Sequence, residues 1–227
     1  KYSIDKMMAH IYKILCYFLG KPIKNFSWEY YNKKDKLKTT KMLTPLEFSK
    51  KFVKFKSNEY ICLVNYPLRK FPMYKKFSIK YCNNMVGGDK TEFVNVPIKD
   101  LRKCTILSLN KNQPVWFGSD VGKFFQSSSG ILDENVFSFD KLFPKDIKEF
   151  SKRDRIILKN SSATHAMVFI GYDKINKKNY EVDKWLVENS WGEEIGNVGY
   201  MRMSNEWFNK FVYQVIVKKA LVGDEIL

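Results

Sequence analysis

The stretch Val187-Glu188-Asn189-Ser190-Trp191-Gly192 decides how this chain is interpreted. It ends a stretch over 180–189 that is predicted to be a strand. An earlier apolar strand over 165–173 begins with His165, and residues 174–178 fit a hairpin between the two strands. Antiparallel neighbours joined in this way place Asn189 beside His165. The sequence therefore predicts an imidazole–amide pair at one end of a sheet.

This pair suits a particular chemistry. An asparagine amide can accept a hydrogen bond from one imidazole nitrogen, which fixes the tautomer and aims the other nitrogen at a neighbouring group. Because the amide is neutral, it orients the base without neutralising it, as a thiolate–imidazolium nucleophile requires. We expect Trp191 to cover the pair and Gly192 to leave room for the indole ring. Taken alone, His165 at the start of a strand is more often structural, so the catalytic interpretation depends on the pair.

Outward from this pair, the C-terminal part of the chain is predicted to be rich in strands. Apolar and β-branched residues indicate further strands at 198–203 and 212–218, separated by a helix at 205–211 with Ser204 as its N-cap. Upstream, strands are expected at 60–65, 77–81 and 113–118, with a helix opening at Pro97 and a break at 85–88. Residues 122–160 are expected to be irregular.

The N-terminal part of the chain has a different pattern. Apolar residues recur at helical spacing from Ile4 to Leu19, and His10 lies off that stripe. Residues 21–43 indicate a connecting hairpin or loop, and Thr44 with Pro45 indicates the start of a helix running to about Lys54. We expect two parts, residues 1–58 and residues 59–227.

Composition limits the remaining possibilities. The 227 residues are 44% hydrophobic and 28% charged, which is typical of a globular protein, and no apolar run approaches the length of a membrane span. Four scattered cysteines fit reduced thiols, and two histidines without nearby ligands predict neither a metal site nor a cofactor. The net charge of +16 is the excess of 35 lysines and five arginines over 24 acidic residues. It fits either a solvated lysine surface or non-specific binding to an anionic partner.

Several segments together resemble the papain family of cysteine peptidases. Asn189-Ser190-Trp191-Gly192 with Gly199-Tyr200-Met201-Arg202-Met203 resembles the family signature around the catalytic asparagine. Thr164-His165-Ala166 with Gly171-Tyr172 resembles its histidine strand, and Gln113-Pro114-Val115 resembles the strand before it.

Within that family the closer resemblance is to the bleomycin hydrolase type, also called the aminopeptidase C type. The segments that carry it are Cys62 to Asn65, Asn84 to Gly88, Val115 to Gly118, Asp120 to Lys123, Val187 to Glu193 and Glu206 to Phe208. The first helix and Phe26 to Tyr30 are similar to its hook-like helical insertion. The resemblance implies an α+β fold, in which a papain-like antiparallel β half-barrel with helices follows part of that insertion.

The resemblance also implies an activity. It identifies a cysteine aminopeptidase that hydrolyses N-terminal peptide or amide bonds, with His165 as general base and acid, Asn189 orienting it and Trp191 supporting the pair. The family nucleophile is a cysteine followed by Trp at the start of an upstream helix, and none of the four cysteines matches, namely Cys16, Cys62, Cys82 and Cys104. The chain is therefore expected to be inactive alone.

Further expectations concern partners. The resemblance implies peptide substrates, an upstream segment carrying the nucleophile, a homohexamer and a C-terminal arm beginning after about Leu227. The scattered reduced cysteines predict a cytoplasmic location. Some family members are reported to bind DNA through a basic central channel of the hexamer. Two alternatives to a peptidase stay open: a basic nucleic acid-binding protein, and a non-catalytic fragment that scaffolds or regulates another subunit.

Overall fold

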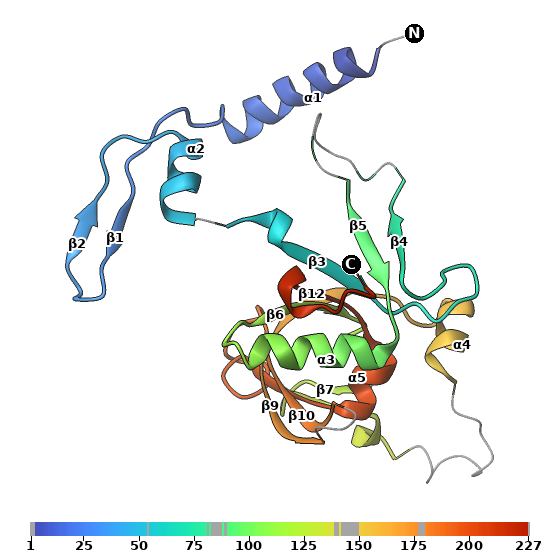
Figure 1. The fold of residues 1–227 in the computed structure, drawn as a ribbon. Coiled ribbons are helices and arrows are strands. Elements are labelled where there is room, and N and C mark those ends of the chain that lie inside the picture. The colour runs from blue at the N-terminus through green and yellow to red at the C-terminus, as the bar shows by residue number, and fades with distance from the viewer. Residues whose placement is uncertain are drawn as a thin grey trace. The chain divides into compact units, whose positions relative to one another are not determined.

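The computed structural model of the chain describes residues 3–53, 55–80, 82, 88, 90–138, 141, 150–176 and 180–226 (Figure 1). The predicted break at 85–87, the hairpin turn at 177–178 and the termini of predicted elements at Lys54, Tyr81 and Leu227 lie outside these residues. The chain forms two compact units, Lys1–Ser57 and Asn58–Leu227, which are described separately.

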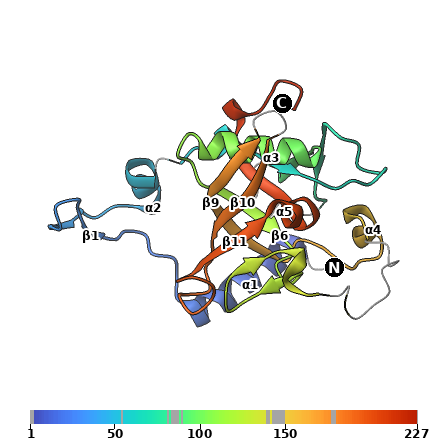
Figure 2. The ribbon, with the colours of Figure 1, turned by 90° about the horizontal axis from the view of Figure 1, so that it is seen from below.

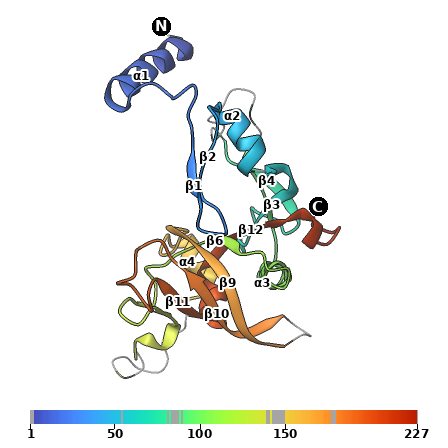
Figure 3. The ribbon, with the colours of Figure 1, turned by 90° about the vertical axis from the view of Figure 1, so that its left-hand side faces the viewer.

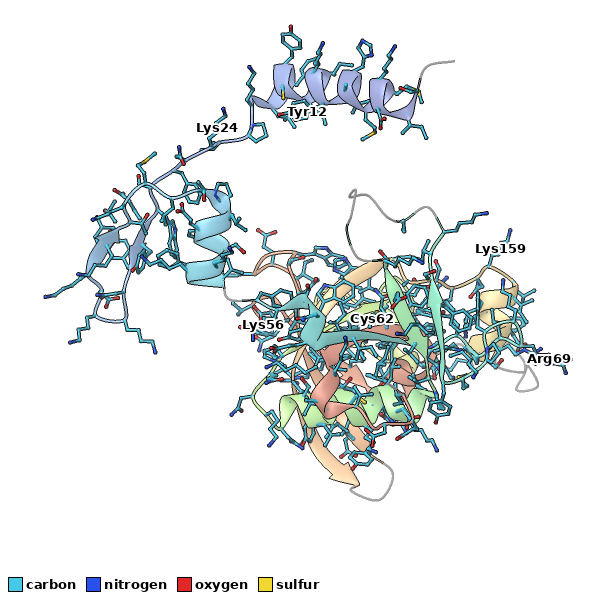
Figure 4. All side chains as sticks on the ribbon, turned by 45° about the horizontal axis from the view of Figure 1, so that its top comes forward. Tyr12, Lys24, Lys56, Cys62, Arg69 and Lys159 are labelled. Atoms are coloured by element: carbon cyan, nitrogen blue, oxygen red, sulfur yellow. The ribbon has the colours of Figure 1, made fainter. Side chains whose placement is uncertain are left out.

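The first unit begins with an amphipathic helix, α1 (Ile4–Leu19), as the periodicity predicts. The Ser3 side chain accepts a hydrogen bond from the Lys6 backbone N–H at the helix start, and Gly20, at φ 80°, ends the helix. None of its residues is buried, and Figure 4 shows the side chains along this helix, with Tyr12 labelled. Among the described helices, none is both long and apolar enough to cross a membrane.

A hairpin and a short helix complete the first unit. Strands β1 (Glu29–Tyr31) and β2 (Leu37–Thr39) pair antiparallel, which confirms the predicted hairpin. Helix α2 (Pro45–Phe48) starts with a capping box and continues as a π-helical turn, η1 (Ser49–Val53). Aromatic rings hold these elements together, and they belong to Phe26, Trp28, Tyr30, Phe48 and Phe52.

The second unit is built on a sheet that has ten strands among the described residues. Its order is β4-β5-β3-β12-β6-β9-β10-β11-β8-β7. Pairing is antiparallel except between β3 and β5 and between β8 and β11. The strands are β3 (Tyr60–Val64), β4 (Lys75–Ser78), β5 (Glu92–Asn95), β6 (Val115–Ser119), β7 (Phe125–Gln126), β8 (Ile131–Leu132), β9 (His165–Asn176), β10 (Glu181–Glu188), β11 (Tyr200–Ser204) and β12 (Val212–Lys218).

Helices pack against the central strands. Helix α3 contacts β12, β6 and β9 (Figure 3), and α5 contacts β10, β11 and β12 (Figure 2). In the described part of this unit the α-helices are α3 (Ile98–Leu109), α4 (Lys152–Ile157) and α5 (Asn205–Phe211). The 3₁₀ turns described are η2 (Ser57–Glu59), which begins at the boundary between the units, η3 (Glu134–Val136) and η5 (Lys219–Leu221).

A chain of buried aromatic rings fixes the central strands and α5 together. Phe117 of β6 stacks on Phe169 of β9 with ring centres 3.8 Å apart. Phe169 contacts Trp185 of β10 at 5.1 Å, and Trp185 stacks on Phe208 of α5 at 4.7 Å. All four side chains are almost completely buried. This core lies directly behind the strand that begins with His165 and makes it a rigid support.

Most of the predicted elements are present, and two predictions need correction. The strand expected from Phe77 begins at Lys75. The stretch 122–160 is not irregular throughout, because it contains β7, β8, η3 and α4. The signal for α4 was Ser151 followed three residues later by Asp154, which form a capping box. The strands β7 and β8 have two residues each, too few for their alternation to show in the sequence.

Candidate active site

His165 and Asn189 lie at the same end of two neighbouring strands. His165 is the first residue of β9, and Asn189 follows directly after β10, which runs beside β9 in Figure 2. The register aligns Glu188 with Val168, and the two side chains meet with His165 Nε2 2.8 Å from Asn189 Oδ1. The structure thus brings together the pair that the sequence places side by side. Its catalytic role stays a prediction.

The hydrogen bonds of Asn189 determine the imidazole tautomer. The Ser190 backbone N–H donates to Asn189 Oδ1 at 2.9 Å, so this atom is an acceptor. The second partner of the same oxygen must also be a donor, and therefore His165 Nε2 carries the hydrogen. In the neutral imidazole the lone pair is then on Nδ1. Nδ1 is the atom that can take a proton from a nucleophile.

Trp191 covers one face of the imidazole. Its ring centre lies 4.5 Å from that of His165, with 31° between the ring planes. The explanation expected for Gly192 is wrong, because a Cβ atom at this position would meet nothing within 4 Å. Gly192 instead has φ +85°, a conformation that side-chain-bearing residues avoid. The glycine is needed to turn the chain behind Trp191.

The other side of His165 is held by β6. Ser119 pairs with His165 across the sheet, and the Thr164 backbone N–H donates to the Ser119 carbonyl at 2.9 Å. On the asparagine side, the Asn189 N–H donates to the carbonyl of Gly199 at 3.1 Å. Sequence reasoning missed Ser119 and Gly199 as supports for the pair. The ends of the predicted strands at 113–118 and 198–203 were the available signals.

None of the three cysteines of the second unit, all of which lie in the described part, is placed as a partner for His165. Cys62 lies on β3, which is separated from β9 by β12 and β6 (Figure 4). Burial raises the pKa of Cys62 to about 11, and it also raises the pKa of Cys104, on α3, to about 11. Cys82 follows β4, still farther across the sheet, and Cys16 belongs to α1 of the first unit. Among the described residues of the second unit, no cysteine thiol therefore lies beside His165.

The second unit can orient and shield a general base. Within the described residues there is no cluster of three histidine, cysteine, aspartate or glutamate side chains suited to a metal ion. The arrangement that is present consists of a tautomer-fixed imidazole, a neutral orienting amide and a covering indole. Such a group can move a proton to and from a nucleophile supplied at Nδ1.

The chain is similar in sequence to proteins of a known family. The sequence profile of the Peptidase C1-like family matches residues 1–227. The chain is 39% identical over 225 residues to bleomycin hydrolase of Homo sapiens and 37% identical over 223 residues to aminopeptidase C of Listeria innocua. Each alignment covers 98% of this chain and 50% of the relative.

A solved structure gives the same result. The crystal structure of PepW from Lactobacillus rhamnosis superposes with a TM-score of 0.89 at 36% sequence identity, covering 98% of this chain and 49% of PepW. The present chain thus spans about half the length of the relatives it matches. The mixed sheet with its flanking helices is the papain-like peptidase fold, as expected from the sequence.

Proposed function

The chain belongs to the Peptidase C1-like family, and from this membership we propose that it supplies the histidine and asparagine half of the active site of a cysteine aminopeptidase. The substrates are peptides, from which the enzyme removes N-terminal residues by hydrolysing peptide or amide bonds. The names of the relatives, bleomycin hydrolase and aminopeptidase C, support this assignment. The nucleophilic cysteine belongs to an upstream segment, and this chain alone is inactive.

The proposed mechanism assigns each side chain one task. His165 Nδ1 takes the proton of the incoming thiol, and the thiolate attacks the scissile carbonyl carbon. The imidazolium then returns the proton to the leaving amine as the C–N bond breaks and a thioester forms. Water, deprotonated by the same imidazole, hydrolyses the thioester and restores the thiol. Asn189 keeps Nε2–H oriented throughout, and Trp191 limits access of water to that hydrogen bond.

The single observation that supports this proposal most directly is that Asn189 Oδ1 accepts two hydrogen bonds. Because this oxygen accepts from both Ser190 N–H and His165 Nε2–H, Nδ1 is left as the proton acceptor. The neutral amide also leaves the imidazolium charge available to stabilise a thiolate.

Reconstitution of the active site tests the proposal. The chain is co-expressed with a segment that carries the nucleophile, and hydrolysis of an aminoacyl fluorogenic amide is measured with and without a thiol alkylator. We expect activity that the alkylator and His165→Ala abolish and that His10→Ala, on α1, preserves. Activity that ignores the alkylator or survives His165→Ala contradicts the mechanism. A stable but inactive complex, together with a full gene product that encodes no nucleophile, supports a scaffolding or regulatory subunit instead.

The remaining assignments are part of the same proposal. Residues 1–58 form part of a hook-like helical insertion, and residues 59–227 form the β-rich half of the catalytic domain. The whole enzyme is a homohexamer in the cytoplasm, and four cysteines without a disulfide support a reducing compartment. Light scattering of the reconstituted enzyme tests the hexamer, because a monomer or dimer contradicts it.

Binding of nucleic acid is a second candidate function, carried by the distribution of charge. Residues 1–57 contain 14 lysines against four acidic residues, and Trp28 stacks on Tyr30 at 4.5 Å between the basic segments. Lysines neutralise phosphates without reading bases, so the binding is non-specific and sensitive to salt. A filter-binding titration with single-stranded DNA tests it across salt concentrations. Absence of binding at low salt excludes this function.

A further inference from the structure

The segment that leads into His165 is held at several points. It begins at α4, where Ser151 and Asp154 form the capping box, and then runs without regular structure to Thr164. The Thr164 N–H donates to the Ser119 carbonyl next to His165. The two other anchors of the segment are buried polar side chains, which the proposed mechanism does not use.

The first anchor is a lysine inside the second unit. Lys152 is only 8% exposed, and its Nζ donates to the Val212 carbonyl at 2.5 Å. The same nitrogen lies 4.7 Å from the centre of the Tyr213 ring. No carboxylate of the described residues forms an ion pair with Lys152. Burying an amine is unfavourable, so a lysine kept here ties α4 to the start of β12 through a specific bond.

The second anchor joins the same strand to the other end of the segment. The Tyr213 hydroxyl donates to Ser161 Oγ at 2.7 Å, and both side chains are buried. Burial raises the pKa of the Tyr213 phenol, which therefore stays protonated at neutral pH and remains a donor. This bond fixes the chain four residues before His165.

The two anchors and the paired strands together form a closed loop of contacts that includes His165. Val212 pairs with Ser119 across β12 and β6, and Ser119 pairs with His165 across β6 and β9. β12 is therefore linked to His165 in two ways. One is the pairing of β12 with β6 and of β6 with β9, and the other is the segment from α4 to Thr164. A shift at either buried anchor is transmitted to the start of β9, because that start is where the two routes meet.

We propose that Lys152, Ser161 and Tyr213 are positioning residues, which hold the start of β9 so that the His165 imidazole stays within hydrogen-bonding distance of Asn189. The consequence for catalysis rests on the proposed peptidase function, whereas the effect on the imidazole does not. None of the three side chains is assigned contact with substrate.

Heteronuclear NMR of the full chain with labelled histidine tests the effect on the imidazole. The chain has two histidines, so His10 of the first unit is an internal reference. We expect Tyr213→Phe and Ser161→Ala each to lower the ratio of the Nε2–H to the Nδ1–H tautomer of His165 by about three- to tenfold, the range that one hydrogen bond controls. The double variant is expected to match the larger single effect, because both changes remove the same bond.

Controls separate positioning from general loss of structure. Asn189→Ala gives the shift expected when the orienting bond is absent, and near-ultraviolet circular dichroism confirms that each variant is folded. Lys152→Met tests the first anchor with a side chain of similar length and is expected to shift the His165 signals in the same direction. Ser161→Thr keeps the hydroxyl and is expected to restore the tautomer ratio. Unchanged His165 signals in folded Tyr213→Phe and Lys152→Met overturn the proposal.

Kinetics of the reconstituted enzyme separate this proposal from the peptidase function. A positioning role lowers kcat in Tyr213→Phe and leaves KM within about twofold, because the substrate contacts are unaltered. If the tautomer shifts but the wild-type enzyme has no peptidase activity, positioning stands and the proposed function fails. If the enzyme is active and both kcat and the tautomer ratio of Tyr213→Phe equal those of the wild type, positioning fails and the proposed function stands.

Discussion

The Trp191 indole lies over the His165 imidazole with ring centres 4.5 Å apart, and it is itself 44% exposed. One face of the indole therefore contacts the base while the other faces solvent or a further segment. Phe125 of β7 contacts the same indole, with ring centres 6.2 Å apart. The short strands β7 and β8 thus contribute to the site by supporting its aromatic cover.

Removing the Trp191 indole is expected to make His165 a less effective general base. Trp191→Ala admits water to the His165–Asn189 hydrogen bond and removes a ring contact worth about 1 kcal/mol, so kcat/KM of the reconstituted enzyme falls by about fivefold. Trp191→Phe keeps a ring over the imidazole and should lose less than half of that effect in free energy. Steady-state hydrolysis of an aminoacyl amide measures both variants. Equal rates for Trp191→Ala and the wild type show that the indole has no such role.

Removing the orienting amide of Asn189 is expected to lower activity more than removing the indole of Trp191. In Asn189→Ala, Nε2–H loses its acceptor and the Nδ1–H tautomer becomes accessible, which places a hydrogen where the thiol proton must go. A hydrogen bond to a group that becomes charged contributes about 1.5 to 3 kcal/mol, so kcat falls by roughly ten- to a hundredfold. Asn189→Gln keeps the amide group but places it one methylene farther from the backbone, so it is the matched control. Full activity in Asn189→Ala contradicts the assigned role.

The thiols of this chain should behave as structural cysteines. Burial raises the pKa of Cys62 and of Cys104 to about 11, so almost none of either is thiolate at neutral pH. Mass-spectrometric labelling of the native chain with iodoacetamide is expected to modify exposed Cys82 at least tenfold faster than these two. His165→Ala should leave all four rates unchanged. A cysteine whose labelling slows in that variant would be a nucleophile that the structure does not indicate.

The sequence predicts strand and helix positions well where alternation or helical spacing is long. Residues 4–19, 205–211 and 212–218 match the observed elements because each buries or displays one regular face. The pairing of His165 with Asn189 follows from two adjacent antiparallel strands, which is a local relationship. Contacts between distant segments, such as Lys152 with Val212, depend on tertiary packing and leave no periodic trace. The role of Gly192 was misjudged because sequence alone does not distinguish a need for space from a need for positive φ.

A glycine can be required for a positive φ or for lack of space around it. Gly192 and Gly196 distinguish these two requirements, because their substitution by alanine should lower the free energy of unfolding by different amounts. Gly192 has φ +85° with free space around it, so Gly192→Ala is expected to cost about 1 to 2 kcal/mol from backbone strain alone. At Gly196, φ is +70° and a Cβ would lie 2.4 Å from the Tyr200 carbonyl oxygen. Gly196→Ala should therefore cost roughly 1 to 3 kcal/mol more. Urea denaturation measures both, and equal losses would contradict the distinction.

Lys152 makes the stability of the chain depend on pH in a direction that can be stated. Burial disfavours the charged amine and holds its pKa in the folded state well below the ordinary value of 10.5. Between these two values the unfolded chain binds more protons than the folded chain, so the free energy of unfolding rises with pH across that window. Below the lowered pKa both states are protonated, and this contribution to the free energy of unfolding is constant at its minimum.

Lys152→Met removes the titrating group. The difference in unfolding free energy between the wild type and the variant should therefore change with pH in favour of the wild type as pH rises towards 10.5. Lys99→Met, at an exposed position on α3, controls for the general effect of losing a lysine and should give a difference that does not vary in this way. Urea unfolding across alkaline pH measures all three proteins. A wild-type stability that falls relative to Lys152→Met over this range would show that the amine is stabilised in its charged form.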